Sequence, residues 1–378
     1  MTDESRPLRI LMTTDAVGGV WSYAITLAEA LGRLPSPYRA EVCLAVMGPP
    51  PAAAQRRRAA AVPNLRLCEG GFRLEWMPEG KSDLGPAAAW LREIAAGWAP
   101  DIIHFNGYML AAESWPAPVV VVGHSCVLSW WRAVHAAPAP PEWDDYARLV
   151  ALGLARADRI VAPSRTMLRA LARQYGLPRG GHVIANGCFP DRFLPAPKED
   201  FVLAAGRLWD DGKNIGALDS IAAQLRCPVY VAGDITHPTG ALVTPRAVQS
   251  LGVLAPETLA HWMARASIYA LPARYEPFGL SVLEAAASGC ALVLGDIPSL
   301  REYWHGAAVF VPPENPDALA QAISALRRDR ERRSWLGSAA RQRAQDFSAG
   351  RMAFGYRQLY SELIDAQRSS TAALADAV

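Results

Sequence analysis

The stretch EPFGLSVLEAAASG, residues 276–289, carries two glutamates, Glu276 and Glu284, that are separated by seven residues. A strand-like run, SIYALPA (267–273), ends just before it, and Pro277 and Gly279 predict a turn. A helix is expected from about Ser281 to residue 289, and because nearly all of its positions are apolar or small, it should be largely buried. A strand, a polar turn and a buried helix in this order are typical of a parallel α/β sheet.

The same alternation extends in both directions along the chain. Helices are expected near 20–33, 86–98 and 143–156, and the tail from about 316 to 367 reads as helical. The expected strands are 8–14, 40–47, 101–105, 118–124 and 158–164 in the first half, and 201–208, 228–234, 267–273, 290–296 and 307–313 in the second. This pattern predicts an α/β protein built from doubly wound parallel sheets.

A chain of 378 residues is longer than one ordinary α/β core needs, so two domains are expected. The segment FPDRFLPAPKED (189–200), with three prolines and clustered charges, reads as the linker between them. We predict domains at 1–195 and 196–346, followed by a C-terminal helix at about 347–367. Ligands of open parallel sheets bind at the carboxyl ends of strands, so the functional residues should follow strands directly.

Composition excludes several classes of protein. The net charge is +2, from 38 basic and 36 acidic residues, which gives no electrostatic case for nucleic acid as a partner. The polar N-terminus does not read as a signal peptide, and no apolar run approaches the ~18 residues that span a bilayer. The six cysteines form no CxxC pair and read as free thiols in a reducing compartment. A cytoplasmic, soluble protein is expected.

The two glutamates allow three interpretations. Ser281 and Glu284 have the spacing of a capping box, and Glu276 can be a solvated loop residue. Alternatively, the start of the helix offers free N–H groups and a positive dipole end to a phosphate. Glu276 would then accept hydrogen bonds from a sugar and Glu284 from the vicinal hydroxyls of a ribose, so that one segment holds a nucleotide sugar.

The segment E-P-F-G-L-x-x-x-E resembles the E-x7-E motif of the retaining glycosyltransferases of family 4, which have the GT-B fold. The resemblance covers nearly the whole chain. Further matching segments occur in the family's order: GGV (18–20), DIIHFNG (101–107), PSRTMLRALARQYG (163–176), VIANGCFPDRF (183–193), AAGRLWDDGKN (204–214), LGVLAPETL (251–259) and FSAGRMAFGYRQLY (347–360).

The resemblance implies two Rossmann-like domains, an N-terminal one for the acceptor and a C-terminal one for the donor, with the C-terminal helix crossing back to the first. It implies that Arg207 and Lys213 neutralise the leaving diphosphate, so that no metal or other cofactor is needed. Without the resemblance, these two residues can be read as solvated basic side chains at a helix start. The other implied donor-binding positions are Gly18, Gly19, Gly252, Val253, Leu254, Glu276, Phe278, Gly279, Leu280, Ser281 and Glu284.

His124 ends the strand-like run PVVVVGH, which places it for contact with a ligand. In the family a histidine at this position lies near the reacting sugar, and many members follow it with aspartate, whereas Ser125 follows it here. His124, Glu276, Arg207 and Lys213 are therefore the candidate catalytic residues. His104, Asn106, Trp130 and Trp131 are candidates for the acceptor side, since aromatic faces stack well on sugar rings.

These residues predict a metal-independent retaining hexosyltransferase that uses a nucleotide-diphosphate sugar and a glycan, lipid-linked or small-molecule acceptor. A lipid-linked acceptor leaves peripheral contact with the inner face of a membrane open. Two alternatives remain at this point: a sugar-nucleotide-binding subunit or sensor without catalysis, and a sugar-nucleotide epimerase on the same fold.

Overall fold

The computed structural model describes residues 6–177, 179–237 and 240–375, with side chains described up to residue 369. The chain divides into two compact units. The described residues of 1–129, 139–187 and 349–378 form the first unit, and those of 130–138 and 188–348 form the second.

The first unit is built on a parallel seven-stranded sheet with the order β3-β2-β1-β4-β5-β6-β7. Its strands are β1 (Leu8–Asp15), β2 (Ala40–Met47), β3 (Leu65–Glu69), β4 (Ile102–Phe105), β5 (Val119–Val122), β6 (Arg159–Ala162) and β7 (His182–Val183). Its helices are α1 (Gly19–Gly32), α2 (Ala53–Ala60), α3 (Leu84–Trp98), α5 (Asp144–Arg156), α6 (Arg165–Tyr175) and α13 (Ala349–Ala375), and α4 (Val127–His135) begins here and runs into the second unit.

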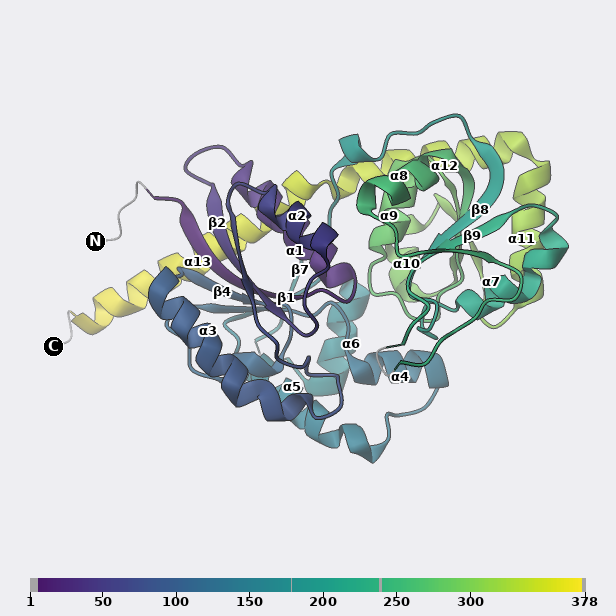
Figure 1. Ribbon diagram of the computed structural model, residues 1–378. Coiled ribbons are helices and arrows are strands. Elements are labelled where there is room, and N and C mark those ends of the chain that lie inside the picture. The colour runs from purple at the N-terminus through teal and green to yellow at the C-terminus, as the bar shows by residue number, and fades with distance from the viewer. Residues whose placement is uncertain (1–5, 178, 238–239, 376–378) are drawn as a thin grey trace. The chain divides into compact units, whose positions relative to one another are not determined.

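Helices cover both faces of this sheet. Figure 1 shows α1 and α13 on one side of it and α3 and α5 on the other. Alternate strand residues face the two layers, so that Leu11 of β1 packs in one core cluster with Leu91 of α3 and Val150 of α5. Helix α13 contacts α1 and buries Tyr356 and Tyr360 completely. The last helix is therefore part of the first unit's core.

The second unit contains a parallel six-stranded sheet with the order β10-β9-β8-β11-β12-β13. Its strands are β8 (Glu199–Ala205), β9 (Val229–Ala232), β10 (Gln249–Gly252), β11 (Ala266–Leu271), β12 (Ala291–Gly295) and β13 (Ala308–Val311). Its helices are α7 (Ile215–Ala222), α8 (Pro256–Arg265), α9 (Leu280–Ala287), α10 (Pro298–Trp304), α11 (Pro316–Arg328) and α12 (Arg330–Ala344). Two parallel α/β sheets confirm the predicted fold class.

The sequence reading did not name three of the observed strands, β3, β7 and β10. None of their residues is buried, so they lack the apolar run that marks a buried parallel strand. The six cysteines are free thiols, as expected, and four of them are buried. Among the described helices, none combines the length and the apolar character that crossing a membrane requires.

Candidate active site

The loop between β11 and α9 places Glu276 in a buried position beside Lys213. The Lys213 Nζ atom donates a hydrogen bond of 2.5 Å to Glu276 Oε2. Glu276 is only 8 % exposed, so the solvated-loop interpretation of this residue is wrong. The N–H groups of Arg274 and Tyr275 both donate to the carbonyl of Gly212, which joins this loop to the one that carries Lys213.

A second ion pair lies on the loop between β8 and α7, which also carries Lys213. Arg207 Nη2 donates to Asp210 Oδ2 at 2.6 Å. The other oxygen, Asp210 Oδ1, accepts from the Trp130 indole and from the Gly212 N–H, each at 3.0 Å. Burial raises the pKa of Asp210, but the charges of Arg207 and Lys213 lower it, and its pKa lies below the ordinary value. Asp210 therefore stays ionised and fixes Arg207.

Arg207 and Lys213 are thus paired cations, and the interpretation of both as solvated basic side chains is wrong. The Arg207 guanidinium also lies over the Trp209 ring, at 4.8 Å from its centre. Trp130, a candidate for the acceptor side, belongs to the second unit and contacts Asp210. Trp131 packs beside Trp130, with 6.1 Å between the ring centres.

Helix α9 begins one residue earlier than predicted, with Gly279 in the left-handed conformation as its N-cap. Ser281 is therefore inside the first turn, and its hydroxyl lies 2.8 Å from the Tyr269 hydroxyl, so it does not form the predicted capping box. The first-turn N–H groups of an α-helix have no intrahelical acceptor, and those of Leu280 and Ser281 are in this position. They are the groups that an anion would use.

The remaining predicted donor-side residues differ in what they expose. Phe278 is buried and packs on Tyr303, with ring centres 5.2 Å apart, so its side chain belongs to the core. Glu284 is partly exposed, and its charge is the second cause, after burial, of a Cys188 pKa raised to about 12. Gly252 ends β10 with a positive φ of 65°, and Val253 after it is 76 % exposed. Leu254 is half-buried.

In the first unit, a hydrogen-bonded network joins His124 to His104 through Asn106. Asn106 Oδ1 lies 2.9 Å from His124 Nε2 and 3.1 Å from His104 Nε2. The Asn106 amide nitrogen donates to the Thr13 carbonyl at 2.8 Å, which fixes the orientation of the amide group. An amide oxygen only accepts hydrogen bonds, so both histidines carry their proton on Nε2.

Tyr360 of α13 completes this network, with its hydroxyl 2.6 Å from His104 Nδ1. Because His104 is protonated on Nε2, its Nδ1 accepts and Tyr360 donates. Burial lowers the pKa of His104 to about 3, and burial together with the neighbouring His104 lowers that of His124 to about 3 as well. Both imidazoles are neutral at pH 7, and Asn106 rather than an aspartate orients His124.

Gly18 and Gly19 form the start of α1, after a two-residue connection from β1. Gly18 is the N-cap residue, and the Asp15 carboxylate accepts a hydrogen bond of 2.8 Å from the Val17 N–H. The loop therefore presents a helix N-terminus at the carboxyl end of the sheet. Within the described residues, no group of three or more His, Cys, Asp or Glu side chains could hold a metal ion.

Sequence reasoning missed three residues that the structure brings to these sites: Asp210, Tyr360 and Glu75. Asp210 stands three residues after Arg207, a spacing that could have indicated the ion pair. Tyr360 lies 256 residues from His104 in the chain, and no local signal indicates that contact. Glu75 accepts hydrogen bonds at one oxygen from the N–H groups of Tyr108 and Met109.

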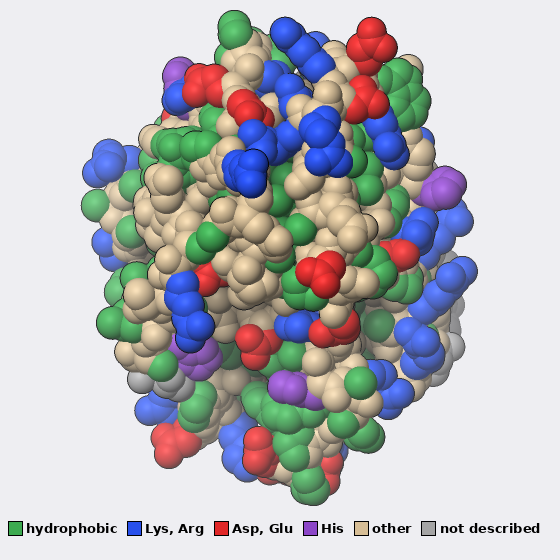
Figure 2. Space-filling model, turned by 90° about the vertical axis from the view of Figure 1, so that its right-hand side faces the viewer, with side chains coloured by type: hydrophobic (Ala, Val, Ile, Leu, Met, Phe, Trp, Pro, Cys, Tyr) green, Lys and Arg blue, Asp and Glu red, His purple; other side chains and the backbone are tan. Residues whose placement is uncertain are grey.

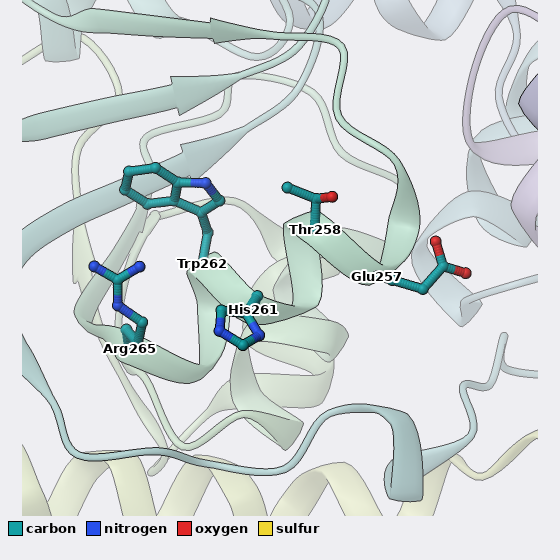
Figure 3. A pocket seen from close by; sticks show the side chains of 5 residues that line it. All are labelled: Glu257, Thr258, His261, Trp262 and Arg265. Carbon is teal, nitrogen blue, oxygen red and sulfur yellow. The ribbon is translucent and has the colours of Figure 1, made fainter.

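A separate hollow of about 310 Å³ lies on α8, and its five lining side chains all come from that helix (Figure 3). None of them is a candidate site residue. Arg265 is paired with Glu199 at 2.6 Å, and the Trp262 ring packs on Tyr230. This hollow is a feature of the surface, and the ion pairs at the strand ends are the better candidate site.

Two family models match the chain, one on each side of the predicted linker. Residues 17–192 match the model described as Glycosyltransferase Family 4, and residues 199–329 match the model described as Glycosyl transferases group 1. A curated relative, the D-inositol 3-phosphate glycosyltransferase of Xylanimonas cellulosilytica, is 25% identical, over 92% of this chain and 93% of its own length.

Solved structures share the fold. The sucrose-phosphate synthase of Thermosynechococcus elongatus superposes with a TM-score of 0.77 at 21% identity, over 95% of this chain and 100% of that one. HepE from Anabaena, solved in complex with UDP-glucose, gives a TM-score of 0.73 at 19% identity, again over 95% of this chain and 100% of that one.

Proposed function

Since the chain belongs to the glycosyltransferases of family 4 and has their GT-B fold, we propose that it transfers a hexose from a nucleotide-diphosphate sugar to a hydroxyl acceptor, with retention at the anomeric carbon and without a metal. The observation that carries the proposal is the placing of two paired cations, Arg207 and Lys213, at strand ends of the second unit. The relative solved with UDP-glucose supports a uridine nucleotide as the first donor to test.

The ion pairs provide charge for a leaving diphosphate. Lys213 neutralises Glu276, and a bound diphosphate offers that lysine a second anionic partner. Glu276 would then accept hydrogen bonds from the donor sugar, while Arg207 is held in place by Asp210. Cations and helix N–H groups that are fixed before the reaction stabilise the negative charge that develops as the anomeric bond breaks. The diphosphate takes the proton of the attacking hydroxyl.

The first test measures free nucleoside diphosphate released from UDP-, GDP- and ADP-sugars in the presence of EDTA. We expect slow release from one donor, and its loss in Arg207→Met and in Glu276→Gln. Arg265→Met is the matched control, because it removes an exposed ion pair on α8 in the same unit. Failure of every sugar nucleotide to bind would refute the donor site.

The same donor panel separates the alternatives when donor binding and the sugar products are measured as well. A donor that binds tightly but is not consumed with any acceptor would favour a sensor or subunit without catalysis, and conversion to an epimeric sugar would favour an epimerase. The six free thiols support action in the cytoplasm, where thiols stay reduced. We include peripheral membrane contact only in the case of a lipid-linked acceptor. Flotation of the protein with anionic vesicles tests this contact. Figure 2 shows basic side chains spread over this face, most closely grouped at its top, with acidic ones among them.

A further inference from the structure

A second hollow lies wholly within the first unit, at the carboxyl ends of β1, β2 and β4. Its cavity volume is about 90 Å³, and the hollow opens to solvent. Thr14 and Asp15 line it from β1, Asn106 follows β4, and the loop from Arg73 to Trp76 forms another wall. It therefore adjoins the histidine network, since Asn106 belongs to both.

Glu75 lines this hollow, and one of its two carboxylate oxygens accepts hydrogen bonds from the backbone. Its Oε2 accepts hydrogen bonds from the backbone N–H groups of Tyr108 at 2.9 Å and Met109 at 3.0 Å. For Oε1, no hydrogen-bond partner occurs among the described residues. Burial raises the pKa of Glu75, although the two amide hydrogen bonds oppose this shift. A carboxylate held in this way presents a fixed acceptor to a hydroxyl group.

The charges around the hollow are predominantly negative. Among the described residues that line it, Arg73 is the one cation, and Asp15, Glu75 and Asp83 are the acids. Arg73 Nη1 lies 3.2 Å from Glu79 and 3.9 Å from Asp83. A phosphomonoester would meet three carboxylates and one cation, so the net charge of the lining opposes its binding. A neutral ligand with several hydroxyl groups would find carboxylate acceptors and the ring of Trp76.

We propose that this hollow binds the acceptor, that the acceptor is an uncharged polyhydroxy compound such as a free sugar or polyol, and that the acidic rim excludes phosphorylated acceptors. In this arrangement Glu75 Oε1 accepts a hydroxyl of the bound sugar, and the Trp76 ring covers an apolar face of it. The inference rests on the proposed function. It also separates this chain from its D-inositol 3-phosphate glycosyltransferase relatives, whose names state a phosphorylated substrate.

The test measures acceptor binding directly, by saturation-transfer NMR in the presence of UDP. Glucose, mannose and myo-inositol are compared with glucose 6-phosphate, mannose 6-phosphate and inositol 1-phosphate. The variants are Glu75→Gln, Trp76→Leu and Asp83→Asn. Glu113→Gln is the control, because Glu113 forms an exposed ion pair with Arg92 and does not line the hollow. This measurement needs no sugar transfer. A failed donor assay would therefore refute the proposed function but would leave the acceptor-binding result open.

We expect at least one neutral compound to bind about tenfold more tightly than its phosphate ester, since one unit charge a few ångströms away in a partly solvated site has an effect of this size. Glu75→Gln and Trp76→Leu should weaken that binding at least about fivefold, and Glu113→Gln should not. Asp83→Asn should reduce the difference in dissociation constant between the phosphate ester and the neutral compound about tenfold. This variant tests the proposal if Glu75→Gln does not fold. Equal or tighter binding of the phosphate esters to the wild type would overturn the proposal, as would unchanged binding in Glu75→Gln.

Discussion

At the scale of single residues, the Lys213–Glu276 pair combines burial with opposite charge. The two side chains are 19% and 9% exposed, so either one alone would be a charge removed from most of its water. Removing one partner of a buried pair leaves the other uncompensated, which is costly, whereas removing both is not. This makes the pair testable without any ligand.

Lys213→Met should lower the free energy of unfolding by about 3 kcal/mol, and the double variant Lys213→Met/Glu276→Gln should recover part of that loss. The control is Arg301→Met, which breaks an ion pair whose partners are 44% and 35% exposed and should cost under about 1 kcal/mol. Urea denaturation measures all three. Equal losses in Lys213→Met and Arg301→Met would show that burial adds nothing to the pair.

Tyr360 is a positioning residue for His124, because it acts through His104 and Asn106. Tyr360→Phe removes the donor to His104 Nδ1 and allows His104 to take either tautomer. Asn106 then loses one of its two hydrogen-bond donors, and His124 is less well oriented. We expect kcat to fall about tenfold with the KM for the donor unchanged.

The ¹⁵N NMR spectrum of the histidine rings supplies the readout that a merely structural role would not move. In the wild type both His104 and His124 should be protonated on Nε2, and in Tyr360→Phe the His104 signal should report a mixture of tautomers. An unchanged tautomer together with a lower kcat would reject this route from Tyr360 to His124.

At the scale of elements, the alternation of apolar strands and helices predicted the order of the chain well, because buried parallel strands carry continuous apolar runs. Glu276, Arg207 and Lys213 stand in loops that follow such strands, and the family resemblance supplied their expected roles. Glu75 was not predicted, because it lies on a loop between 70 and 83 in which apolar residues recur with neither helical nor strand periodicity. That loop closes only because Gly80 has no side chain, as a Cβ there would lie 2.2 Å from the Leu74 carbonyl oxygen.

The carboxyl ends of β8 and β9 approach each other closely, and glycine makes this possible. A Cβ on Gly233 would lie 1.9 Å from the Gly206 carbonyl oxygen, and its φ of 156° also disfavours a side chain. Gly233→Ala should therefore destabilise the second unit by at least about 2 kcal/mol and weaken donor binding, because it displaces the strand end that precedes Arg207.

Gly216 of α7 is the matched control for Gly233, since nothing lies within 4 Å of the Cβ that an alanine would add there. Gly216→Ala should stabilise the protein by about 0.5–1 kcal/mol, because alanine loses less backbone entropy in a helix. Thermal unfolding of the two variants measures both effects. A Gly233→Ala variant as stable as the wild type would contradict the close approach of the two strand ends.

At the scale of the whole molecule, α13 shows why part of the site lies beyond sequence reasoning. Local pattern predicted a C-terminal helix, but its residues contribute Tyr356 and Tyr360 to the core of a unit that begins at the other end of the chain. The family resemblance supplied the expectation that this helix crosses back. Only the folded structure supplies the hydrogen bond from Tyr360 to His104, and with it the orientation of the whole network.

The two histidines of this network make the stability of the whole protein depend on pH. Burial lowers the pKa of His104 and of His124 from 6.5 to about 3. The unfolded chain therefore binds these protons as the pH falls below 6.5, whereas the folded protein does not until about pH 3, so stability is lost as the pH falls through this range. Between pH 7 and pH 5 each histidine should cost about 2 kcal/mol.

Urea denaturation at pH 7, 6 and 5 measures this loss, in a range above the titration of most carboxylates. His124→Gln should remove about half of the pH dependence, because one imidazole then no longer takes up a proton on unfolding. His182→Gln, which replaces an exposed histidine of β7, should retain all of it. If His124→Gln kept the full pH dependence, the loss of stability would have to come from groups outside this network. That result would also reject a neutral, Nε2-protonated His124, on which the positioning role of Tyr360 depends.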